Sequence, residues 1–401
     1  MEDSSARVDA VQLLQDGARG PVITPVGDGK IDVTFGLPRP HDGGQVLMIS
    51  GFVKDGASPR RLPPAPGTDM VARTWRLPDD YLGTYLFWLG QPGLELPETF
   101  DELLPLIYSA GHPIPDPSNP ETFTYPVDPE NPGPPFVQSI VRGPAALADE
   151  FATAPLLGAL TEHRVASTHM SDERRVWVHE STGITPDGPP PALMVVFDGG
   201  IYAHLMHTPE IVDALVAAGE FPPLVTLYCH YSADPARNPE LMCREDFAAF
   251  IVDELLPWAA ARWSFTSDPA RTIVAGSSLG GLSSMWMAYR HPERFGNVIA
   301  QSPSAGWHPN EPAETGYMTQ RWAQDGPRAV HFYVEMGEFE RGAGPDGRSG
   351  YEHTQDFVAA LRTHGNDVDY QDFCGGHDYL NWRATFPRAL RSLARRFDRS
   401  L

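Results

Sequence analysis

The sequence predicts an α/β protein, with a mostly parallel sheet covered by helices, preceded by an all-β sandwich. After about residue 175, short apolar runs typical of buried strands alternate with longer runs of helical periodicity. Before about residue 113, short strand-like runs are separated by turn signals such as Asp42-Gly43 and Pro66-Gly67, which favour antiparallel sheets. We therefore expect an N-terminal β-sandwich domain at residues 1–140 and an α/β domain at residues 141–401.

The N-terminal region contains two clear strand patterns and a proline-rich stretch. The strand patterns are residues 45–49 and 83–88, which are rich in aliphatic and aromatic side chains. The prolines crowd the segment from Pro113 to Pro135. Proline at this density excludes regular helix and most sheet, so we expect an extended linker or a strap across the domain surface.

The second domain is expected to contain seven strands and five helices in alternation. Its apolar runs are short enough for buried strands, and its helical patterns are longer and amphipathic. Strands are predicted at residues 175–179, 193–197, 224–229, 272–275, 297–301, 329–335 and 368–373. Helices are predicted at residues 209–218, 245–263, 282–289, 354–364 and 382–397.

Composition limits the possible partners and compartment. The 401 residues carry a formal net charge of -22, which disfavours nucleic acid and anionic membranes as partners. The three widely spaced cysteines form neither a disulfide framework nor a zinc signature, which indicates a reducing compartment. The N-terminus lacks a basic leader, and no stretch approaches the ~20 apolar residues of a spanning helix. We therefore expect a soluble, cytoplasmic protein and make no prediction of its oligomeric state.

A nucleophile motif lies between a predicted strand and a predicted helix. Residues 276–280 read Gly-Ser-Ser-Leu-Gly, follow the apolar run at 272–275 and open the helical run at 282–289. This is the strand, sharp turn and helix of a nucleophile elbow, in which small residues on either side of the central serine avoid collisions. Ser278 is therefore the predicted nucleophile.

A histidine and several acids follow the serine in the order typical of α/β-hydrolases. His377 lies in a short glycine-containing loop between a strand and the closing helix, where it can act as the general base. Glu335, Glu338 and Glu340 cluster at the end of the preceding strand. Because the acid normally lies in the loop after that strand, spacing leaves Glu338 and Glu340 as alternatives.

Backbone amides for an oxyanion are expected at two turns. The amide of Leu279, directly after the nucleophile, is one candidate, and Gly199 or Gly200 after the strand at 193–197 supplies the other. The alternative for the two glycines is an ordinary turn. No metal site is predicted, because the nearby pair His204 and His207 lacks a third ligand.

With these residues in order, the chain resembles the enterochelin (ferric enterobactin) esterase family over nearly its whole length. The N-terminal stretches that resemble the family's sandwich domain are residues 67–70, 74–78, 83–87 and 116–120. In the second domain the similar stretches are residues 197–200, 237–241, 247–258, 276–281, 301–304 and 375–378, with Trp382-Arg383. The family's E-A-G-x-x-E pattern lies over residues 335–340 and assigns the acid to Glu340, although Met336 departs from it.

The resemblance implies hydrolysis of the ester bonds of a tri-catecholate trilactone siderophore in the cytoplasm, with release of iron. Iron would belong to the substrate, and no cofactor is expected. Such a substrate is strongly anionic, so Arg237 and Arg383 are candidates for binding it, although either could equally form a structural ion pair. Trp307 could wall the pocket against aromatic rings or lie in the core.

Two other functions remain compatible with these residues. One is a different serine hydrolase on the same scaffold, which acts on carboxylic or feruloyl esters or transfers an acyl group. The other is a siderophore-binding or glycan-binding protein with vestigial hydrolysis. The intact set of Ser278, Glu340 and His377 argues against the second.

Overall fold

The computed structural model describes residues 4–53, 60–95, 105–130, 134–231, 237–310 and 313–397. Its contacts divide the chain into two compact units: residues 1–148 with 374–381, and residues 149–373 with 382–401. Residue 140, the predicted boundary, lies within strand β8 of the first unit. The short segment 374–381, which includes His377, packs with the first unit although the chain on both sides of it belongs to the second.

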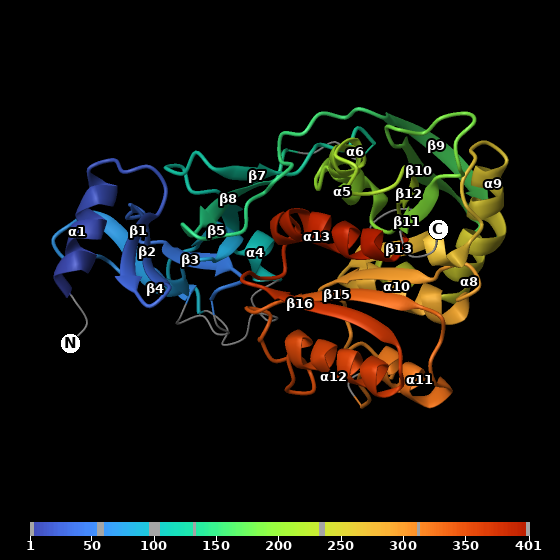
Figure 1. The fold of residues 1–401 in the computed structure, drawn as a ribbon. Helices are drawn as coiled ribbons and strands as arrows, with labels where there is room; N and C mark the ends of the chain where they lie inside the picture. Colours follow the sequence, from blue (N-terminus) through green and yellow to red (C-terminus); the bar gives the residue numbers. More distant parts are fainter. Residues whose placement is uncertain are drawn as a thin grey trace. The chain divides into compact units, whose positions relative to one another are not determined.

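The first unit contains two antiparallel sheets, as the sequence predicts (Figure 1). One sheet has the order β1-β2-β4, and the other has the order β3-β5-β8-β7 with β6 paired to β5. The strands are β1 (Val22–Gly27), β2 (Lys30–Pro38), β3 (Gln45–Ser50), β4 (Met70–Pro78), β5 (Leu82–Gly90), β6 (Gly111–Ile114), β7 (Thr122–Thr124) and β8 (Val137–Arg142). The helices are α1 (Ser4–Gln15), which the sequence analysis does not predict, and the short α4 (Leu106–Ser109).

The proline-rich stretch is partly built into a sheet. Strand β7 contains no proline and pairs with β8, while β6 contains Pro113 and pairs with β5 alone. Proline is tolerated on a strand whose N–H side is not needed for pairing. Of the two predicted alternatives, a linker or a strap across the domain surface, the linker is therefore wrong for these two strands, which pair within the sheet. Residues 131–133 of the stretch lie outside the described residues.

The second unit is built on an eight-stranded sheet with the order β16-β15-β14-β13-β11-β12-β10-β9. The six strands from β16 to β12 in this order are parallel, and β10 and β9 close one edge in antiparallel pairing. All seven predicted strands are present, whereas β9 is not predicted. The strands are β9 (Ala159–Ser167), β10 (Asp172–Glu180), β11 (Ala192–Val196), β12 (Leu224–Cys229), β13 (Thr272–Ser277), β14 (Asn297–Gln301), β15 (His331–Gly337) and β16 (Asp367–Phe373).

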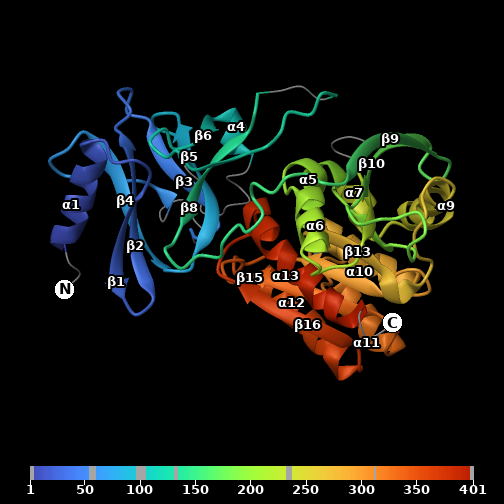
Figure 2. The same ribbon diagram turned by 45° about the horizontal axis from the view of Figure 1, so that its top comes forward.

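Helices cover both faces of this sheet. Figures 1 and 2 show α11 and α12 on one face, with α10 beside them, and α13 with α6 on the other. The helical elements are α5 (Gly199–His204), α6 (Thr208–Ala217), α7 (Arg237–Leu241), α8 (Glu245–Ala249), η1 (Phe250–Leu255), α9 (Leu256–Ala260), η2 (Pro269–Arg271), α10 (Leu279–Arg290), α11 (Tyr317–Asp325), α12 (Gly350–Thr363) and α13 (Tyr379–Phe397). None of the described helices is long and apolar enough to cross a membrane.

The helix predicted at residues 245–263 is present, but it is shorter than predicted and is not α-helical throughout. The structure divides this region into α8, the π-helical η1 and α9, which ends at Ala260. Pro257 has no N–H to donate into the helical ladder, and the turn before it is wound with the wider π spacing. Helices α5, α7 and α11 are also absent from the prediction.

The sheet brings several loops of the second unit to one edge. The central strands β11 and β13 are buried along their whole length and are largely apolar, as expected for parallel strands covered on both faces. Because neighbouring parallel strands end at the same edge, the loops after β11, β13, β14 and β15 meet there. All of the predicted oxyanion residues and the predicted nucleophile lie in these loops.

Candidate active site

The loop after β13 has the geometry of a nucleophile elbow. Ser278 is the N-cap of α10 and has φ 55° and ψ −120°, a conformation that non-glycine residues rarely adopt. A side chain at Gly276 would place its Cβ 2.5 Å from the backbone carbon of Gly280, so the motif requires glycine there. The Ser278 N–H donates to the Gln301 carbonyl at 3.0 Å, which ties the turn to β14. The half-buried Ser278 side chain thus stands on a tightly fixed turn.

The predicted oxyanion amides lie just after the two neighbouring strands β11 and β13, at the starts of α5 and α10. Neither Leu279 N–H nor Gly199 N–H donates a hydrogen bond to any residue that the structure describes. The Gly200 N–H differs, because it faces His230 Nδ1 at 3.4 Å. A Cβ at Gly199 would lie 2.5 Å from the backbone of Tyr228, so close packing on β12 explains this glycine. The arrangement leaves Leu279 and Gly199 as the available pair of donors.

The loop after β15 holds the Glu340 carboxylate by hydrogen bonds. Glu340 Oε1 accepts from Ser302 Oγ at 2.6 Å and from the Gly337 N–H at 3.0 Å. Ser302 Oγ in turn accepts from Trp382 Nε1 at 2.9 Å. Glu338, the alternative acid, has an exposed side chain. The contacts therefore orient Glu340 and leave Glu338 in solvent.

A second carboxyl, that of Glu335, is buried below this loop. It accepts from the amide of Gln301 at 2.7 Å and from the hydroxyls of Thr385 and Tyr333. Burial raises the pKa of Glu335 to about 7, although these three donors oppose the shift. Gln301 also donates to the carbonyl of Trp382, so the network joins β14, β15 and α13.

His377 lies in the segment that joins β16 to α13, as predicted, and this segment packs in the first unit. The Leu82 N–H donates to the carbonyl of Cys374, and the Thr84 N–H donates to Asp378 Oδ2 at 3.1 Å. A Cβ at Gly375 would lie 2.4 Å from the side chain of Asn381. This glycine therefore makes room for Asn381 and does not serve a left-handed turn.

The predicted substrate-binding residues already contact other parts of the protein. Arg237 forms a two-point ion pair with Asp198, and Arg383 pairs with Asp149. Trp307 is half-buried, and its ring packs edge-on against Tyr317 with the centroids 5.8 Å apart. Each of these contacts is compatible with a structural role, and the substrate-binding roles stay predictions.

The sequence analysis assigns no role to three residues near these loops, although all three lie in stretches that resemble the family. Asp198 has φ 55° and is fully buried at the start of α5, and Ser302 has φ 42° at the end of β14. Trp382 connects α13 to Ser302. Asp198 and Ser302 lie in the motifs at residues 197–200 and 301–304, but only Gly199 and Gly200 of these motifs were assigned a role. Within the described residues, no cluster of three or more His, Cys, Asp or Glu side chains is arranged to hold a metal ion.

A family model described as a putative esterase matches residues 167–393, which is more than half of the chain. The chain belongs to this esterase family. It is a carboxylic ester hydrolase, and the matched residues include the elbow, both turns with predicted oxyanion amides, the loop after β15 and His377. The observed sheet and elbow agree with this assignment.

Similar proteins extend the comparison to both units of this esterase. The iron(III) enterobactin esterase of Dickeya dadantii is 32% identical over 58% of this chain, but the alignment spans only 54% of that protein. The iron(III) enterobactin esterase of Escherichia coli O6:H1 is 26% identical over 92% of this chain and 93% of its own length. The crystal structure of ferric enterobactin esterase from Salmonella typhimurium is 25% identical, covers 96% of this chain and 99% of that one, and has a TM-score of 0.79. The resemblance to enterochelin esterases is confirmed.

Proposed function

We propose that this esterase hydrolyses the ester bonds of a ferric tri-catecholate trilactone siderophore of the enterobactin type and so releases iron in the cytoplasm. The observation that carries the proposal is the alignment with the Escherichia coli iron(III) enterobactin esterase, which runs through both units of this chain. Opening the macrocycle removes the preorganisation that makes such a ligand chelate tightly. Iron is therefore part of the substrate.

The proposed chemistry is acyl transfer through Ser278. His377 removes the proton of the Ser278 hydroxyl as its oxygen attacks the lactone carbonyl, and Glu340 holds the imidazole. The Leu279 and Gly199 amides stabilise the negative charge on the carbonyl oxygen. The ester bond then breaks, the leaving alcohol takes the proton from His377, and water releases the acyl group by the reverse sequence. The strained Ser278 backbone and the two amides just after the ends of neighbouring strands support this assignment.

The assignment of the acid to Glu340 rests on its fixed Oε1. Two donors, Ser302 Oγ and Gly337 N–H, occupy this oxygen and set the orientation of the carboxyl group. A carboxylate that is held in one orientation fixes the tautomer of its histidine, which an exposed side chain such as Glu338 cannot do.

A neutral carboxylic or feruloyl ester is the second candidate substrate. It is favoured by the net charge of -22 and by the carboxylates that pair with both candidate arginines. Paired arginines offer less net charge to an anionic catecholate than isolated ones do.

A substrate panel tests the proposal. The enzyme is supplied with a ferric tri-catecholate trilactone, its iron-free form, a short neutral acyl ester and a feruloylated sugar, and the products are followed by mass spectrometry. We expect the trilactone to be opened with a kcat/KM at least tenfold above that of either other ester class. Hydrolysis of the neutral or feruloyl ester with an intact trilactone would overturn the proposed substrate and leave the esterase chemistry in place.

A further inference from the structure

The short helix α7 forms two ion pairs through side chains on one face, one of them part-buried and the other buried. Arg237 and Glu240 are three residues apart on α7, so their side chains lie on the same side of the helix. Arg237 reaches the loop after β11, and Glu240 reaches β10. A helix of five residues has little stability of its own, so these contacts fix its position.

The first ion pair reaches the oxyanion loop. Arg237 Nε lies 2.6 Å from Asp198 Oδ1, and Arg237 Nη2 lies 2.6 Å from Asp198 Oδ2. The Asp198 side chain is fully buried, and it does not cap its own helix α5. Asp198 directly precedes Gly199, whose N–H is one of the proposed oxyanion donors. The guanidinium therefore holds the residue that sets the direction of this amide.

The same carboxylate also lies against the nucleophile elbow. A Cβ built on Gly280 would be 3.3 Å from Asp198 Oδ2, which is tighter than most real contacts of that kind. Gly280 belongs to the turn that carries Ser278 and Leu279. Asp198 thus packs between the two loops that supply the oxyanion donors.

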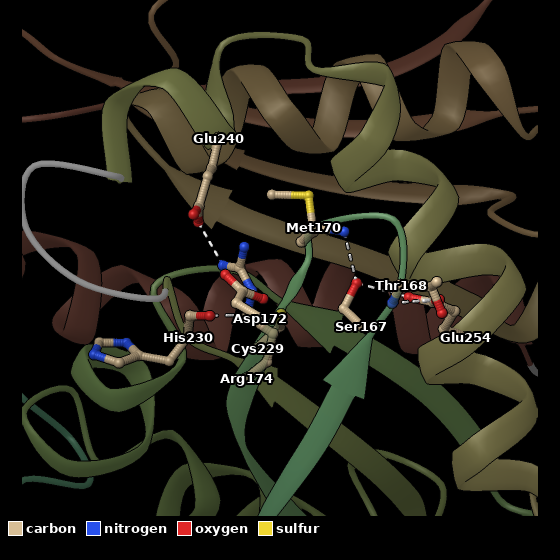
Figure 3. Close-up of polar contacts among 9 residues, drawn as sticks. All are labelled: Ser167, Thr168, Met170, Asp172, Arg174, Cys229, His230, Glu240 and Glu254. Atoms are coloured by element: carbon tan, nitrogen blue, oxygen red, sulfur yellow. Dashed lines mark hydrogen bonds and ion pairs between the residues drawn. The ribbon is translucent and has the colours of Figure 1, made fainter.

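The second ion pair anchors α7 to the sheet. Figure 3 shows Glu240 reaching from α7 to the guanidinium of Arg174, which also contacts Asp172. Arg174 Nη1 lies 2.7 Å from Glu240 Oε2, and the Arg174 side chain is fully buried. Buried charges with complementary partners resist displacement, because a broken pair leaves an uncompensated charge in the interior. The pair holds α7 against β10 and so holds Arg237 over the loop after β11.

We propose that Arg237 is a positioning residue for the oxyanion donors of this esterase and not a ligand of the substrate. Through Asp198 it fixes the Gly199 amide against the elbow, and the Glu240–Arg174 pair fixes Arg237. The inference rests on the proposed acyl-transfer chemistry but not on the identity of the ester. An arginine that binds substrate acts on KM for anionic esters, whereas an arginine that positions oxyanion donors acts on kcat for every ester.

The test compares Arg237→Met and Arg237→Lys with wild type on a ferric tri-catecholate trilactone and on a short neutral ester. Arg244→Met is the matched control, because it removes one nearby positive charge from an exposed ion pair with Asp246. We expect Arg237→Met to lower kcat by roughly ten- to a hundredfold on every ester that wild type hydrolyses, with KM changed less than about threefold. Arg237→Lys should recover part of the loss, and the control should resemble wild type.

Asp198→Asn combined with Arg237→Met keeps the test informative if the single variant is unstable. This double variant leaves no unpaired buried charge, so it should fold. Its kcat should stay low because the ion pair that held the loop is absent. A large rise in KM for the trilactone alone, with kcat unchanged, would overturn the proposal in favour of substrate binding. A wild-type kcat in the folded double variant would also overturn it. If wild type cleaves only the neutral ester, the siderophore proposal fails, and the positioning role is still measured on that ester.

Discussion

Two loops at the same edge of the sheet are held in place by different physical means. The elbow after β13 is fixed by sterics, since Gly276 and Gly280 pack backbone against backbone around a strained Ser278. The loop after β15 is fixed by polar contacts, since Ser302 and Gly337 donate to Glu340. Steric fixation leaves a local mark in the sequence, whereas polar fixation depends on residues that are distant along the chain. Substitutions in the first loop should therefore abolish hydrolysis, whereas substitutions in the second should lower its rate in smaller steps.

The largest effect is expected at the nucleophile. Ser278→Ala removes only the hydroxyl from a half-buried position, so the fold should be retained. Hydrolysis should fall on the order of 10⁴-fold or more, because members of a catalytic triad act as one unit. Steady-state kinetics on the best substrate of the panel, with circular dichroism to check folding, measure this change. A folded variant that keeps more than a few per cent of activity would contradict a serine nucleophile.

The acid loop should give a smaller effect that depends on which glutamate is changed. Glu340→Gln keeps the shape of the side chain but removes the charge that is proposed to hold the histidine, and we expect a kcat loss on the order of 10²- to 10³-fold. Glu338→Gln is the matched control, because its side chain is exposed. It should stay within about twofold of wild type. A larger loss at Glu338 than at Glu340 would reverse the assignment of the acid.

The polar chain behind Glu340 should give an intermediate loss. Ser302→Ala removes the donor 2.6 Å from Glu340 Oε1 but leaves the Gly337 N–H in place. A hydrogen bond to a charged group is worth about 1.5–3 kcal/mol, so kcat should fall roughly ten- to a hundredfold. Kinetics of Ser302→Ala and of the double variant with Glu340→Gln measure the coupling. If the two losses simply add, the two residues act independently and this polar chain does not orient the acid.

The smallest effect on catalysis is expected at Glu335, which supports the network below the acid loop. Its prediction concerns the free energy of unfolding. Burial raises the pKa of this carboxyl to about 7, so the folded chain keeps a proton that the unfolded chain loses at lower pH. The free energy of unfolding should therefore fall as pH rises from about 5 to 7. Glu335→Gln does not titrate and should lack this fall, with a difference on the order of 3 kcal/mol across the window. Urea unfolding at several pH values measures it, and parallel curves for the two proteins would contradict the buried, protonated carboxyl.

The comparison of the two loops also explains what the sequence could and could not predict. The elbow was predictable because its glycines and serine act within five residues, between an apolar strand and a helix. Residue spacing alone did not choose between Glu338 and Glu340 as the acid, because the hydrogen bond that orients Glu340 comes from Ser302, 38 residues away. Ser302 is in turn held by Trp382, 80 residues further on. The choice between substrate binding and a structural ion pair for Arg237 stayed open for the same reason, since its partner Asp198 is 39 residues away.

The fold shows the same distinction between local and distant determinants. The central strands were predicted because burial on both faces makes them continuous apolar runs. Strand β9 was missed because its residues are largely exposed on the edge of the sheet and lack that signal. The helix at residues 245–263 was predicted three residues too long, and its change from α to π winding at residues 250–255 was not predicted. The sequence also did not predict that the segment 374–381 packs with the first unit.

Labelling with a fluorophosphonate, in the presence and absence of a ferric tri-catecholate trilactone, tests the central claim most directly. The account predicts one adduct on the peptide that contains Ser278, no adduct in Ser278→Ala, and labelling that slows as the siderophore concentration rises. An adduct on a different residue would contradict the serine mechanism. Labelling of Ser278 at a rate that the siderophore leaves unchanged would contradict its role as the substrate.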